Sequence, residues 1–143
     1  MAVISDSARQ VKHFIYEELD LTNVRQQAKD TYHWDDETVD TAERRYRDFL
    51  WVCWNFAVGE TTMTWVSLLA DKMGHTHLQT PAAFVAACER IFGKGKALVH
   101  MPLYDGRLVE EADCAKARDH YVALDIPLPA DLRPRCIWAV VTS

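Results

Sequence analysis

Apolar residues recur at intervals of three and four positions along much of the chain, and this pattern is clearest between His33 and Gly59. Acidic residues open the stretch, where they favour the positive end of a helix dipole, and Gly59 stands where a helix often stops. The spacing predicts the central core helix, with the charged residues on its solvated side. The residues predicted to share its buried face are Val39, Ala42, Tyr46, Phe49, Leu50, Cys53, Trp54 and Ala57.

Shorter stretches with helical spacing or composition lie on both sides of this helix. Ser5 or Ser7 can cap a first helix, and a second is predicted to follow it. Residues 65–73 are helical in composition, and 109–124 are helical again. Thr80 followed by Pro81 predicts the start of another helix, which Gly93 closes. The inward positions of the first, second and Pro81 helices are predicted to be Val11, Phe14, Ile15, Leu19, Val24, Ala28, Tyr32, Phe84, Cys88, Ile91 and Phe92.

The predicted fold class is therefore all-α: a compact bundle of about five to six helices, with residues 1–143 as a single domain. The proline-rich stretch 125–135 cannot form a regular helix, because proline removes a hydrogen-bond donor and fixes the backbone. Residues 97–101 are a possible short extended piece within a loop. The apolar, β-branched run 136–143 indicates either a strand or an extended tail laid over the helices.

Composition and charge narrow the class of protein. Of the 143 residues, 49% are hydrophobic and 26% charged, which is typical of a globular domain. The formal net charge of −5 disfavours nucleic-acid binding, and no window of the sequence has the length of a membrane span. The N-terminus has no signal-peptide pattern, so a cytoplasmic location is expected. No phosphate-binding loop or C-x-x-C pair is present, so no organic cofactor is expected, and the sequence leaves the oligomeric state open.

Candidate chemistry gathers around two histidines near the end of the helical stretch that begins at Trp65. If the helix continues through His75, Asp71 lies four residues before it on the same face and can fix the tautomer of the imidazole. His77 would then point to nearly the opposite side, so joint action with His75 requires a break in the helix. Gly74 makes such a break possible.

A third imidazole, His100, lies on the predicted loop and would return to the same place if the Pro81 helix packs antiparallel to its predecessor. His75, His77 and His100 would then satisfy zinc or iron chemically, so the cofactor expectation is none or a divalent metal. The alternative is that the histidines are buried polar groups that connect helices.

The order and spacing of four motifs resemble the bacterial glycine-rich-domain-containing-protein-like family, small helical proteins related to part of a plant protein. The motifs are AERRYRDFLWVC, DKMGHTHL, FVAACERIFG and HMPLYDG, and the similarity covers about residues 42–106. The positions that fit the family pattern are Tyr46, Phe49, Leu50, Asp71, His75, His77, Cys88, Phe92, Gly93, His100 and Pro102. The resemblance implies a helical fold and no particular reaction.

The chain also departs from the family pattern. Gly74 stands where the family has tryptophan, Phe84 where it has tyrosine, Ala87 where it has aspartate, and Val99 where a second histidine often precedes the one matching His100. The loss of an indole at Gly74 predicts a pocket beside His75, unless neighbouring side chains refill it. The residues predicted to bind substrate there are Gly74, Trp65, Trp54, Phe84 and His100.

Two functions follow as expectations. The first is an enzyme of specialised metabolism that transforms a small organic substrate, with His75, Asp71 and His77 as catalytic residues. Its chemistry would be proton transfer with elimination, cyclisation, isomerisation or hydrolysis, possibly metal-assisted. The alternative is a non-catalytic binding or adaptor module, in which the same residues form a structural polar network.

Overall fold

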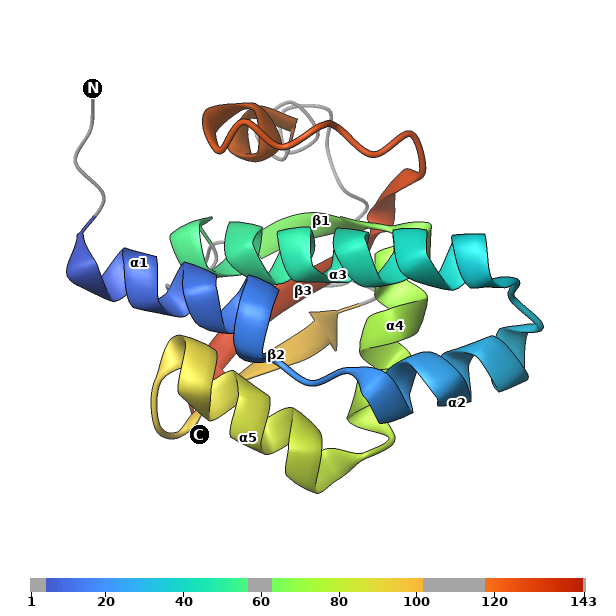
Figure 1. Cartoon of the computed structure of the whole chain (residues 1–143). Coiled ribbons are helices and arrows are strands. Elements are labelled where there is room, and N and C mark those ends of the chain that lie inside the picture. Colours follow the sequence, from blue (N-terminus) through green and yellow to red (C-terminus); the bar gives the residue numbers. More distant parts are fainter. Residues whose placement is uncertain (1–4, 57–62, 102–117, 143) are drawn as a thin grey trace.

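The computed structural model describes residues 5–56, 63–101 and 118–142, with only the backbone for 63–65, 100–101, 133–139 and 141–142. Its helices and strands are arranged as a small sheet with helices packed against it and against one another (Figure 1). In chain order they are α1 (Asp6–His13), the π-helical turn η1 (Phe14–Glu18), α2 (Thr22–Tyr32), α3 (Asp36–Phe56), β1 (Met63–Ser67), α4 (Leu68–Leu78), α5 (Pro81–Phe92), β2 (Lys96–Met101), a helical turn at 118–123 and β3 (Leu132–Thr142).

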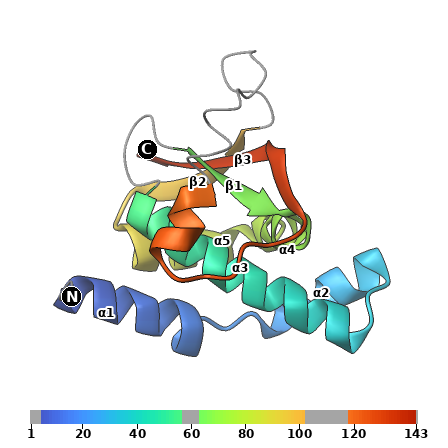
Figure 2. The ribbon, with the colours of Figure 1, turned by 90° about the horizontal axis from the view of Figure 1, so that it is seen from above.

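The central helix α3 lies between α1 and the sheet. Figure 2 shows α1 on one side of α3 and the sheet on the other, while α2 lies beside α4 near one end of α3. All eight buried residues of α3 belong to the stretch for which the apolar spacing predicts the core helix: Val39, Ala42, Tyr46, Phe49, Leu50, Trp51, Val52 and Cys53. The prediction of a core helix is confirmed, while the predicted Ala57 and Gly59 lie outside the described residues.

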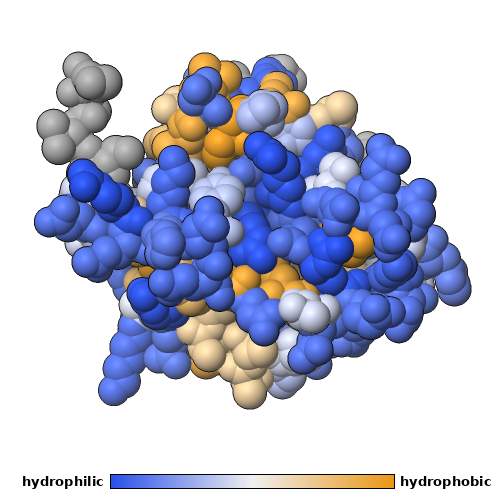
Figure 3. All heavy atoms as spheres, in the orientation of Figure 1, coloured by the Kyte–Doolittle hydropathy of each residue, from blue (hydrophilic) through white to orange (hydrophobic). Residues whose placement is uncertain are grey.

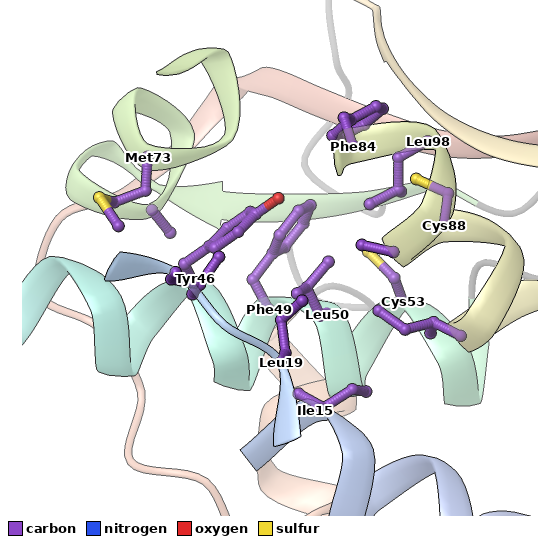
Figure 4. Close-up of a cluster of buried hydrophobic side chains, with 14 of the residues drawn as sticks. Ile15, Leu19, Tyr46, Phe49, Leu50, Cys53, Met73, Phe84, Cys88 and Leu98 are labelled. Atoms are coloured by element: carbon purple, nitrogen blue, oxygen red, sulfur yellow. The ribbon is translucent and has the colours of Figure 1, made fainter. Parts of the chain in front are cut away.

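The core is one cluster to which most elements contribute. Tyr46, Phe49 and Cys53 project from α3 toward side chains of α5 and β2, including Phe84 and Leu98 (Figure 4). Burying a side chain of this size stabilises the fold by about 1.5–3 kcal/mol relative to leaving it in water. The long amphipathic α3 therefore organises the fold.

Helices predominate, as the all-α prediction expects, but the structure adds a three-stranded antiparallel sheet in the order β1-β3-β2. The C-terminal run is its central strand, so the open choice between strand and tail is settled for Leu132–Thr142. The extended piece at 97–101 is confirmed as part of β2. None of the described helices combines the length and apolar character of a membrane span.

Residues 65–73 were predicted to be helical, and this is wrong at the beginning of the stretch. Trp65 to Ser67 belong to β1, which pairs with β3, and α4 begins at Leu68. The pairing of Met63 with Ala139 joins positions far apart in sequence, which a local pattern cannot reveal. For the predicted helix at 109–124, residues 118–123 are helical, and 109–117 lie outside the described part of the chain.

The start of α4 is fixed by hydrogen bonds to Ser67, directly before it, and to Asp131, directly before β3. The Ser67 hydroxyl accepts from the Ala70 amide at 2.9 Å, and the Asp131 carboxylate accepts from the Leu69 amide at 3.1 Å. The Asp131 main-chain carbonyl accepts from the Leu68 amide at 2.9 Å. Asp131 also pairs with Arg45 of α3. These bonds satisfy the first amides of α4 and hold the helix against α3 and β3.

Candidate functional site

The predicted acid–base pair, Asp71 and His75, lies on α4, which runs unbroken from Leu68 to Leu78. Because the helix continues, Asp71 and His75 share a face, and His75 Nε2 lies 3.3 Å from Asp71 Oδ2. The carboxylate side chain is 10% exposed and the imidazole 38%. The predicted pairing is confirmed: a nearly buried acid orients a histidine that solvent reaches.

This contact assigns the two nitrogens of His75 different roles when the ring is neutral. A proton on Nε2 is directed at the Asp71 carboxylate, which leaves the lone pair on Nδ1. A carboxylate beside an imidazole fixes its orientation and its tautomer. The pair therefore has the arrangement of an oriented acid or base that solvent reaches.

His77 lies on the other side of α4, buried against α3 and α5. Its Nδ1 is 2.7 Å from the Tyr46 hydroxyl, and its ring meets Tyr46 and Phe84 edge to face, with centroids 5.7 and 5.2 Å away. Burial lowers the pKa of His77 from 6.5 to about 4, and burial raises the pKa of Tyr46 well above 10. At neutral pH both groups are uncharged and share one buried hydrogen bond, whose direction follows the tautomer of the imidazole.

The proposed joint action of His75 and His77 is therefore wrong. It required a break at Gly74, but Gly74 is buried within α4 and the helix continues past it. One glycine costs a helix about 1 kcal/mol relative to alanine. Burial of Met73 and His77 on the same helix offsets that cost.

The predicted metal set is not assembled by the described part of the chain. His77 is held by Tyr46 inside the core, whereas His75 faces Asp71. Among the described side chains, no three histidine, cysteine, aspartate or glutamate residues gather as a metal site. His100 lies in β2 and not on a loop, its backbone paired with Trp138, and its side chain is outside the described part.

The residues predicted to line a pocket beside His75 are dispersed. Phe84 contacts His77 in the core, whereas Trp54 stacks on Trp51 of α3 with ring centroids 5.4 Å apart and planes at 5°. Trp65 lies in β1 opposite Ile137, with its side chain outside the described part. Among the described side chains of the predicted site, Asp71 meets His75 and Phe84 meets His77, but the two pairs lie on different sides of α4.

A hollow that the sequence does not indicate lies between α1, α3 and residues 124–127. It has a volume of about 500 Å³, and Tyr16, Asp48 and Trp51 are among the residues lining it. The Tyr16 hydroxyl donates to Asp48 Oδ1 at 2.6 Å. Burial, followed by this bond, raises the pKa of Tyr16 well above its usual 10, so the hydroxyl keeps its proton. No spacing rule joins residues 32 positions apart, so only the packing of η1 on α3 reveals the site.

No protein-family model matches this chain, and searches of curated proteins and of solved structures return no match either.

Proposed function

We propose that this protein is an enzyme that transforms a small organic molecule by proton transfer, with His75 as the acid or base and Asp71 as its positioning residue. The single observation that supports this is the 3.3 Å contact between His75 Nε2 and a carboxylate that is itself nearly buried. A general base must be both oriented and reachable, and His75 meets both conditions. Elimination, cyclisation, isomerisation and hydrolysis all use such a step.

A second candidate function is a non-catalytic binding or adaptor module. The observation in its favour is the buried hydrogen bond between Tyr46 and His77, which gives His77 a structural role. The two proposals differ in what they require of His75, which must react in the first and need not in the second.

The resemblance to the bacterial family stays a prediction. Its apolar positions, such as Tyr46, Phe49 and Cys88, are buried. Helical spacing alone also requires this, so their burial supports the predicted core and adds nothing about function.

Hydrolysis of p-nitrophenyl acetate tests whether His75 is reactive, because this activated ester responds to accessible, unprotonated imidazoles. We expect His75→Gln to lower the rate of nitrophenolate release by roughly tenfold. This is less than general acid–base catalysis usually contributes, because the ester is a probe and not the natural substrate. Asp71→Asn is expected to give an intermediate rate, because the ring loses its orienting charge but remains.

The chain offers a matched control at His13. Its Nε2 is also 3.3 Å from a carboxylate oxygen, that of Glu18, but there both side chains are at least half exposed. Because His13 is the more exposed ring but lacks a buried carboxylate, His13→Gln measures what accessibility alone contributes, and it is expected to lower the rate less than His75→Gln. If His75→Gln keeps the wild-type rate, or if His13→Gln lowers it more, the acid–base proposal fails and the binding module is favoured.

A further inference from the structure

The hollow between α1, α3 and residues 124–127 has the size and shape of a small-molecule site. Its volume of about 500 Å³ falls within the usual range for ligand pockets, roughly 300–1,000 Å³. In Figure 3, hydrophilic side chains cover α1 and α3, and apolar side chains gather above them, over the segment around the helical turn 118–123. The hollow therefore lies where a charged surface meets an apolar one.

One wall of the hollow is aromatic and rigid. Trp51 is only 5% exposed, and its ring stacks in parallel on Trp54. The ammonium group of Lys12 lies 5.7 Å from the centroid of the Trp51 ring. Trp54 and Lys12 thus cover most of the indole, and a ligand in the hollow meets the small exposed part of Trp51 and the lysine charge beside it.

The opposite wall is apolar and held in place by its own backbone bonds. Leu124 and Ile126 pack against the core cluster, and their amides donate to the Tyr121 carbonyl at 3.2 and 3.0 Å. Tyr121 is buried, with 1% of its surface exposed. The segment is thus tied to the core, and the space between it and Trp51 is formed before any ligand arrives.

The hollow offers two cations to a single negative group on the ligand, within a lining that has as many carboxylates as lysine and arginine side chains. Lys12 and Arg44 line it, and neither makes an ion pair within the described part of the chain. Asp48 accepts the Tyr16 hydroxyl, so part of its acceptor capacity is used. Glu17 and other carboxylates on the lining limit the positive potential, which disfavours a polyanion such as a triphosphate.

A second hollow of similar volume shares Tyr16 and Arg44 with the first, and its other charged residues pair with one another. Arg25 pairs with Asp40 and Glu43, both at 2.7 Å, and Arg47 pairs with Glu43 at 2.9 Å. Lys12 lines the first hollow and not the second, so an anion in the first hollow can meet two cations that make no ion pair within the described part of the chain.

We propose that the hollow between α1, α3 and residues 124–127 binds a small aromatic carboxylate, its ring against Leu124 and Ile126 and its carboxylate on Lys12 and Arg44. This binding site is separate from the His75 pair and does not depend on its chemistry.

Three probes distinguish this ligand class from its alternatives: 2-naphthoate, 2-naphthylmethylamine and cyclohexanecarboxylate. Titration into the ¹⁵N-labelled full chain, followed by amide and indole NMR shifts, gives each Kd and the place of binding. We expect 2-naphthoate to bind roughly tenfold more tightly than either control probe. The amine lacks the negative charge, and cyclohexanecarboxylate lacks the flat ring. The shifts should centre on Lys12, Trp51 and Ile126.

Exposed residues give variants that are expected to fold. Lys12→Gln and Arg44→Gln should each weaken 2-naphthoate binding by about three- to fivefold, the effect of losing one partly solvated ion pair. Lys94→Gln removes the same charge from an exposed lysine after α5, outside the hollow, and should leave Kd unchanged. The proposal is overturned if the amine binds as tightly as the carboxylate, if the shifts centre elsewhere, if the Lys12 and Arg44 variants match Lys94→Gln, or if millimolar 2-naphthoate causes no shifts.

Discussion

Tyr46→Ala is expected to lower the free energy of unfolding by about 3–5 kcal/mol, the usual cost of deleting a large aromatic side chain from a core. Tyr46 is 1% exposed and lies at the centre of the cluster in Figure 4. Because domains of this kind are stable by about 5–15 kcal/mol in total, the loss is a large fraction of the whole. Urea unfolding at pH 7.5, followed by circular dichroism, measures it.

A milder substitution separates the hydrogen bond from the packing. Tyr46→Phe keeps the ring and removes only the hydroxyl that reaches His77 Nδ1, so it should cost about 1–3 kcal/mol, the penalty of an unpaired buried polar atom. Tyr46→Phe combined with His77→Phe removes both polar partners and should recover part of that loss. If Tyr46→Phe is as stable as the wild type, the bond contributes nothing and this part of the account is wrong.

Acidification is expected to destabilise the protein well before its carboxylates protonate. The pKa of His77 is about 4 in the folded chain and 6.5 in the unfolded chain, because burial disfavours the charged ring. Between these values only the unfolded chain binds the proton. The stabilisation is therefore complete above pH 6.5, falls as pH decreases, and is lost near pH 4. The difference corresponds to about 3 kcal/mol.

Urea unfolding at half-unit steps from pH 7.5 to pH 4.5 measures this slope, and His77→Phe identifies its source. The variant should be less stable at pH 7.5, since the Tyr46 hydroxyl loses its hydrogen-bond partner, but its stability should vary much less with pH. A wild-type slope that His77→Phe leaves unchanged would assign the pH dependence to other groups.

The parts of the fold that sequence predicts well are those governed by local spacing. The face of α3 follows from the three- and four-residue recurrence of its apolar residues, and Pro81 and Gly93 mark the ends of α5. The alignment of Asp71 with His75 follows in the same way from the geometry of one helical turn. In each case the physical cause acts within a few residues.

The parts that sequence does not predict depend on distant partners. Trp65 is compatible with a helix or a strand, and its pairing with β3 decides between them. Gly74 suggests a break in the helix by its intrinsic propensity, but tertiary burial of Met73 and His77 outweighs it. The contact of Tyr46 with His77 joins positions 31 apart, and the packing of α4 on α3 creates it.

One unbroken helix, α4, places His75 where solvent reaches it and buries His77. Brief treatment of the native protein at pH 6.5 with diethyl pyrocarbonate, which modifies accessible neutral imidazoles, tests this arrangement most directly when tandem mass spectrometry locates the modified ring. We expect His75, 38% exposed, to be modified early and His77, 2% exposed, to react only when the protein unfolds. Equal rates at the two rings, or faster reaction at His77, would contradict it.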